Sequence, residues 1–186
     1  ANDHGQLTLP LFEYRTPQLI LSSGVNNVTT GRTHTLFVKD DGSLWGMGGN
    51  ESGQLGDGTN QNRGYPVQVI SSGVKQAASF HKHSIVVMKD GSVWTTGHNL
   101  FGQLGDGSTN SRNTFGKVID SGMIKVDVGS YHSIAINNHQ IFGFGKNFFG
   151  QRGQAANSTQ KTPVNLGISS SAIFAKRLIA SAGADH

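Results

Sequence analysis

The sequence predicts an all-β protein in which a four-stranded antiparallel unit repeats about every 49 residues. Landmarks recur three times in one order: a histidine, a large aromatic residue, an asparagine and a Gly-Gln-x-Gly run. Glycine contributes 26 of 186 residues and charged residues only 14%, which favours tight turns between short strands. Four short strands per unit, repeated radially, describe the blades of a β-propeller.

The repeats form a single array over residues 1–186. The complete copies are 22–70, 71–119 and 120–168. Residues 1–21 match the tail of a preceding repeat, and 169–186 match a connection followed by the start of a further one. We therefore expect the array to start and stop inside repeats.

Within the first copy, strands are expected at 29–31, 34–38, 43–48 and 65–70. Asp41-Gly42 predicts a hairpin turn between the second and third strands, because glycine supplies the positive φ that such turns need. Pro66 favours an edge position for the fourth strand. A solenoid of β-hairpins is the competing architecture.

Residues 28–38, followed by DGSLWGMGGNESGQLGDGT from Asp41, resemble the repeat of the regulator of chromosome condensation family. The resemblance covers essentially the whole chain, although the second copy has Phe80 in place of a glycine and the third has Asp127 and Val128 in place of small residues. It implies a seven-bladed propeller, of which this chain would supply about half. The remaining blades would come from a longer chain or from self-association.

Residues that recur at one offset in every copy are expected to have architectural roles. We expect the recurring histidines to hydrogen-bond to nearby backbone and the recurring aromatic residues to pack between blades. These residues are His34, His83, His132, Trp45, Trp94 and Phe142. A metal site is not expected, because equivalent atoms of adjacent blades diverge. Asp57 and Asp106 are expected to stabilise turns.

Residues that vary between copies are the candidates for specificity. In an up-down-up-down blade, the loop between strands one and two and the loop between strands three and four emerge on one face. Aromatic residues mixed with cations on that face have the composition of protein-binding hot spots. The candidate residues are Arg32, Phe80, His81, Lys82, Phe101, Tyr131, Phe148 and Phe149. The alternative is that Phe101 and Phe148 or Phe149 fold back to cover the top of the blade.

Composition argues against several other classes of protein. There is no cysteine, so disulfides and thiolate metal sites are excluded, and no apolar run approaches transmembrane length. No catalytic constellation stands out, so neither an enzyme nor a cofactor is expected. The net charge of +4 comes without a basic stripe, which argues against nucleic acid as a partner. Asn27, Asn50 and Asn157 begin triplets that are glycosylation acceptors in form only.

The leading functional hypothesis is a non-catalytic protein-protein interaction module that binds a protein partner through the loop face. The family resemblance adds guanine-nucleotide exchange or regulation of a small GTPase, although no inserted wedge is present in the three copies. A secreted inhibitor or carbohydrate-binding propeller is a third hypothesis, favoured by low charge and abundant asparagine. Ala1 in place of an initiator methionine fits a secreted, processed or partial chain, and no compartment is identified.

Overall fold

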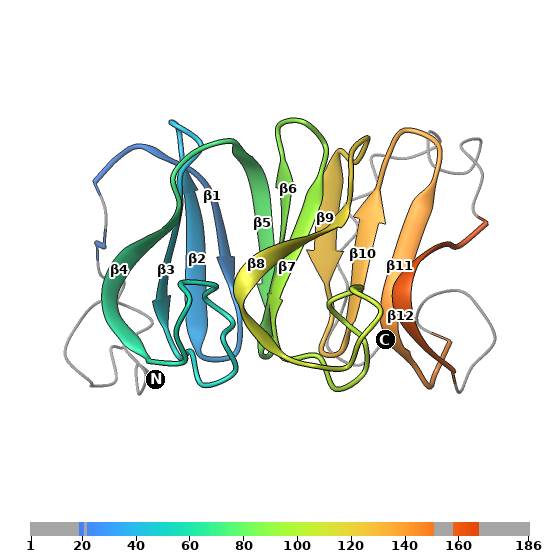
Figure 1. The fold of residues 1–186 in the computed structure, drawn as a ribbon. Helices are drawn as coiled ribbons and strands as arrows, with labels where there is room; N and C mark the ends of the chain where they lie inside the picture. Colours follow the sequence, from blue (N-terminus) through green and yellow to red (C-terminus); the bar gives the residue numbers. More distant parts are fainter. Residues whose placement is uncertain (1–18, 21, 151–157, 168–186) are drawn as a thin grey trace.

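A computed structural model describes residues 19–20, 22–150 and 158–167. It contains three four-stranded antiparallel sheets and no helix within those residues, which confirms the predicted all-β blades (Figure 1). The first blade comprises β1 (Val25–Thr30), β2 (His34–Lys39), β3 (Leu44–Gly48) and β4 (Arg63–Ile70). The second comprises β5 (Val74–Phe80), β6 (His83–Met88), β7 (Val93–Gly97) and β8 (Arg112–Ile119). The third comprises β9 (Lys125–Val128), β10 (His132–Ile136), β11 (Ile141–Asn147) and β12 (Ser158–Asn165).

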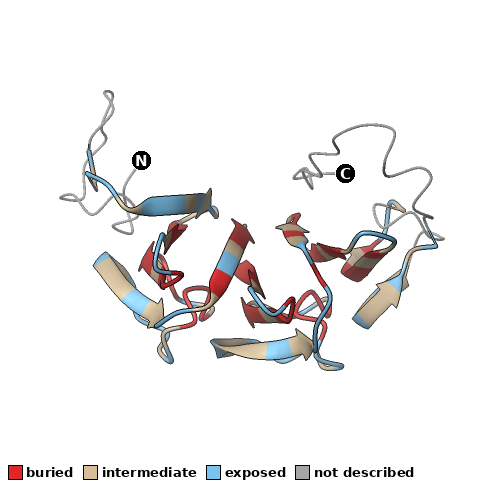
Figure 2. Ribbon diagram, turned by 90° about the horizontal axis from the view of Figure 1, so that it is seen from above, coloured by how far each residue is buried: buried red, intermediate tan, exposed pale blue. Residues whose placement is uncertain are grey.

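The blades fan out side by side, with strands in sequence order within each sheet. Viewed from above, β1, β5 and β9 lie on one side of the arc and β4, β8 and β12 on the other (Figure 2). We call these the inner and the outer strands. Pro66 lies in β4, an edge strand of its sheet, as its missing N–H donor predicts.

The first inner strand begins earlier than the sequence predicts, at Val25 instead of Thr29. Its polar residues are accommodated because their side chains bond to the next blade. The Ala77 N–H donates to Asn27 Oδ1 and the Ser79 N–H donates to Thr29 Oγ1, each at 3.0 Å. The partner of Asn27 lies in the following repeat, so local hydrophobic periodicity could not reveal the first half of the strand, from Val25 to Val28.

Two apolar cores join the three blades. One lies between the first and second blades, and Trp94 packs against it. The other lies between the second and third blades, and Phe142 packs against it. Trp45 instead stacks on Phe37 of its own blade, with ring centroids 6.5 Å apart.

Buried histidines add a polar link between blades. His34 Nε2 lies 2.9 Å from Ser84 Oγ, and the Ser84 hydroxyl donates to the carbonyl oxygen of Gln54 at 2.8 Å. His83 repeats the arrangement with Ser133 at 3.1 Å. Because each hydroxyl donates its proton to a carbonyl, it accepts from the histidine, which is therefore protonated on Nε2. The structure thus adds a partner that the sequence did not indicate, a serine side chain in the next blade, and His83 also bonds to the backbone of His132.

These histidines predict loss of stability in acid. In the folded chain, burial lowers the pKa of His34 to about 4, and burial with His132 and His34 nearby lowers the pKa of His83 to about 3. The ordinary value is 6.5, so below that pH the unfolded chain binds protons that the folded chain does not. The free energy of unfolding should therefore be undiminished above about pH 6.5 and should fall as the pH drops towards 4.

Urea unfolding at a series of pH values measures this dependence. The slope should be shallower in His83→Asn and unchanged in His139→Gln, since His139 is exposed. A free energy of unfolding that stays constant between about pH 7.5 and about pH 5 would contradict the role assigned to His34 and His83.

Candidate protein-binding surface

The loops that vary between copies gather on one face, at the lower edge of the sheets in Figure 1. Hydrogen bonds join the two loops of each blade: His98 N donates to Lys82 O at 2.9 Å and Lys146 N donates to Tyr131 O at 2.8 Å. Gly97 makes this approach possible, because it has a φ of 105° and an added Cβ would lie 2.5 Å from Lys82 O. In these two blades the residue that follows the glycine of the third strand, His98 or Lys146, therefore lies beside the first loop.

The long loop of the second blade is held from beneath by buried polar side chains. Asn99 Oδ1 accepts from Leu104 N at 2.9 Å, and Asn99 Nδ2 donates to Asn110 O at 3.1 Å. Gln103 Oε1 accepts from Phe101 N at 2.9 Å. Asn99 and Gln103 are fully buried, so the backbone that carries Phe101 rests on a fixed base.

The first blade repeats this loop geometry. Asn50 is fully buried and its Oδ1 accepts from Leu55 N at 2.9 Å, so the folded chain shields Asn50 from glycosylation. Asp57 Oδ1 accepts from Thr59 N at 3.0 Å, which is the expected turn-stabilising role. Asp57 also forms an ion pair with Arg63 at 2.7 Å.

Six rings form an aromatic cluster on the loop face. It comprises His81, His98, Phe101, Tyr131, Phe148 and Phe149. Tyr131 meets Phe101 edge to face at 5.0 Å and His81 at 5.1 Å between centroids. Phe101 meets Phe148 at 6.1 Å. Such ring pairings stabilise a structure by more than the burial of their apolar area alone would do.

Lys146 lies among these rings. Its ammonium nitrogen is 4.7 Å from the ring centroid of Phe148, 5.2 Å from Tyr131 and 5.3 Å from Phe101. The distance to Phe149 is 6.0 Å, at the limit for a cation–π interaction. Phe148 is 41% exposed and Phe149 is 79% exposed. Rings of the aromatic cluster therefore pack against one another, and the cluster still presents apolar surface to solvent.

The electrostatic environment of the aromatic cluster is positive. Burial lowers the pKa of His81, and Arg32, Lys82 and His98 lower it further. Burial and then Lys82 lower the pKa of His98. Both histidines are therefore neutral at pH 7, and the charge near the aromatic cluster belongs to the lysines and Arg32.

The backbone is strained at His81. With a φ of 42°, it is the only residue other than glycine with positive φ in the described part of the chain. In the first and third copies, glycine precedes this position, and a Cβ on Gly31 would overlap the ring of His34. Phe80 occupies the equivalent position, pairs with His83 across the hairpin and packs against the second core. His81 takes up the unusual conformation at the tip of the shortened loop.

The structure brings together most of the variable residues singled out from the sequence. His81, Phe101, Tyr131, Phe148 and Phe149 belong to the aromatic cluster. Arg32 and Lys82 lie close enough to shift the pKa of His81, whereas Phe80 contributes to the core. Sequence comparison did not single out His98 and Lys146. Their signal was the position before the buried asparagine, which is Gly49, His98 and Lys146 in successive copies.

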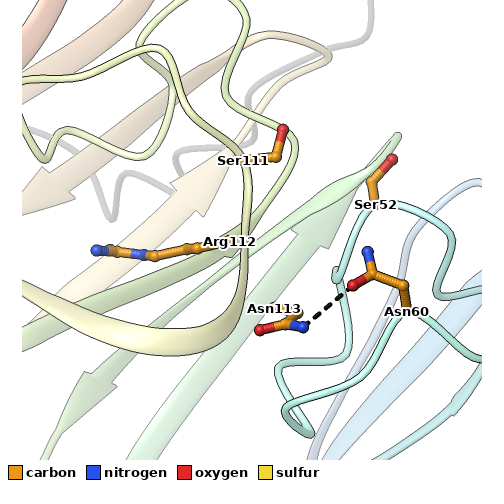
Figure 3. Close-up of a pocket in the computed structure, with 5 residues that line it drawn as sticks. All are labelled: Ser52, Asn60, Ser111, Arg112 and Asn113. Carbon is orange, nitrogen blue, oxygen red and sulfur yellow. Dashed lines mark hydrogen bonds between the residues drawn. The ribbon is translucent and has the colours of Figure 1, made fainter.

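A separate cleft of about 300 Å³ lies between the first and second blades, lined by Ser52, Asn60, Ser111, Arg112 and Asn113 (Figure 3). Asn113 Nδ2 donates to Asn60 Oδ1 at 3.1 Å across it. The Arg112 side chain points away and donates to Thr95 and Gly116. The polar groups of this cleft are thus largely committed to the fold.

The described residues contain neither a metal-binding group nor a membrane-spanning helix. No group of three or more histidine, aspartate or glutamate side chains there could hold a metal ion. The same part of the chain contains no helix of the length and apolarity that a membrane span requires.

Known proteins share this repeat and this fold. The regulator of chromosome condensation (RCC1) repeat matches residues 41–87 and 90–136, and a second description of that repeat matches 25–54. No curated protein matches the sequence.

Solved structures with this fold have low sequence identity to the chain. Human WBSCR16 is 23% identical with a TM-score of 0.74, over 89% of this chain and 45% of that one. Prp20p from Saccharomyces cerevisiae, described with its binding properties to Gsp1p and histones, is 17% identical with a TM-score of 0.79, over 90% and 45%. Yeast RCC1 (Prp20) bound to Kap60 is 18% identical with a TM-score of 0.74, over 90% and 43%. The chain thus spans about half the length of these relatives, and by its repeats it belongs to the regulator of chromosome condensation family.

Proposed function

We propose that this chain is a non-catalytic interaction module that binds a partner protein through the aromatic cluster. Its family and fold support a protein-interaction or GTPase-regulatory module. The observation that carries the proposal is the convergence of six rings and Lys146 on the variable loop face, with Phe149 79% exposed. The protein partners of one fold relative, yeast Prp20 (RCC1), namely Gsp1p, histones and Kap60, agree with a protein ligand.

The construction of the surface fits protein recognition. Rings held by edge-to-face contacts lose little conformational freedom on binding, and large amphipathic side chains are typical of interface hot spots. Buried Asn99 and Gln103 fix the loop that carries Phe101. The strained φ of His81 is consistent with a functional site, because strain concentrates where the surrounding structure imposes it.

Affinity capture with two matched variants tests the proposal. Phe149 and Tyr65 are equally exposed, at 79% and 77%, but only Phe149 belongs to the aromatic cluster. Proteins retained by the immobilised wild-type chain should also be retained by Tyr65→Ser and lost with Phe149→Ser, as measured by quantitative mass spectrometry. Equal retention by the two variants would contradict the proposed surface.

A further inference from the structure

We infer that the partner offers this surface an acidic segment that carries an aromatic or aliphatic side chain next to its carboxylates. The inference rests on the proposed function and specifies the chemistry of the partner. It follows from cations that form no salt bridge with a described residue and that lie beside exposed rings.

The cations around the aromatic cluster have no ion-pair partner among the residues that the structure describes. Arg32, Lys82 and Lys146 form no salt bridge there. The directions of the pKa shifts of His81 and His98 support this, because the charges of described residues that act on these two histidines lower their pKa values. The local field is therefore positive and would attract a negatively charged segment.

Acidic side chains of the same loops are already engaged. Asp57 pairs with Arg63 at 2.7 Å, and Asp106 pairs with Arg112 at 3.5 Å. Glu51 Oε1 accepts from Asn62 at 3.1 Å. Within the described residues, Asp57 and Asp106 therefore pair with arginines of their own loops and form no ion pair with Arg32, Lys82 or Lys146.

Lys146 is positioned to bind a carboxylate and an apolar group together. Rings of Phe101, Tyr131 and Phe148 lie within 5.3 Å of its ammonium nitrogen and restrict its movement. An ammonium group held in place loses less entropy when it pairs with a carboxylate. Exposed Phe149 lies beside it and offers apolar surface to a neighbouring side chain of the partner.

Panning a random peptide library on the full chain tests the inference. Enriched peptides should contain more Asp and Glu than Lys and Arg, with an apolar residue among them, and should bind more weakly as salt rises. Lys146→Gln and Lys82→Gln should each weaken binding about two- to fivefold, the effect of one partly screened ion pair. Lys117→Gln is the matched control, because Lys117 lies on outer strand β8 and pairs with Asp120.

The outcomes separate this inference from the proposed function. If the enriched peptides are neutral or basic and their binding is lost with Phe149→Ser, the inference of an acidic partner segment is wrong and the proposed binding surface stands. Peptides that bind Phe149→Ser as tightly as wild type, or no enrichment at all, would overturn the binding surface and the inference with it.

Discussion

Replacing Phe101 by alanine should weaken partner binding by about thirtyfold, the effect of losing a hot-spot residue worth about 2 kcal/mol. Phe101 is the ring that links the others: it contacts Tyr131 at 5.0 Å and Phe148 at 6.1 Å, and Lys146 lies 5.3 Å from its centroid. Without it, both neighbouring rings and the lysine lose a supporting contact. Fluorescence anisotropy with the captured partner or a selected peptide measures the change in Kd.

Leu100 provides the control for Phe101. It is adjacent in sequence and 60% exposed, but its aliphatic side chain can make none of the ring–ring pairings that Phe101 makes with Tyr131 and Phe148. Leu100→Ala should leave the Kd within about twofold of wild type, and thermal unfolding should show that both variants are folded. A similar loss of affinity in the two variants would show that the loop as a whole, and not the ring of Phe101, accounts for binding.

Replacing Asn99 by alanine should lower the free energy of unfolding by about 3 kcal/mol. The side chain is fully buried and bonds to Leu104 N, Asp106 Oδ1 and Asn110 O. Alanine would leave these groups without that partner in a site closed to solvent, where each unsatisfied group is costly. Chemical denaturation measures the change.

Asn110→Ala is the matched asparagine replacement. Asn110 lies in the same loop and is exposed, so this change should cost less than about 0.5 kcal/mol. A loss from Asn99→Ala no larger than that from Asn110→Ala would mean that the loop is held by other contacts.

Repetition made the blades predictable from the sequence. Apolar runs such as Ile85–Val87 are local signals that all three copies contain, and the first two copies add an Asp-Gly turn. The first half of β1, from Val25 to Val28, was missed because the side chain of Asn27 finds its partner in the next blade, beyond any local pattern. The serine partners of His34 and His83 were missed for the same reason.

The aromatic cluster was predictable from the sequence only in part. Variation between copies selected His81, Phe101 and Tyr131, which the fold brings into contact. It also selected Phe80, whose place in the core depends on the shortened hairpin. Lys146 also lies at a position that varies between copies, but its place among the rings depends on how the two loops of the blade pack together.

Site-specific photocrosslinking is the most direct test that the aromatic cluster is the partner-binding surface. A benzophenone amino acid in place of Phe149 should yield a discrete protein adduct, and adding Phe101→Ala should remove it. The same probe in place of Tyr65, which is as exposed but lies on outer strand β4, should yield none. Identical adducts from both positions, or an adduct at 149 that persists with Phe101→Ala, would contradict the account.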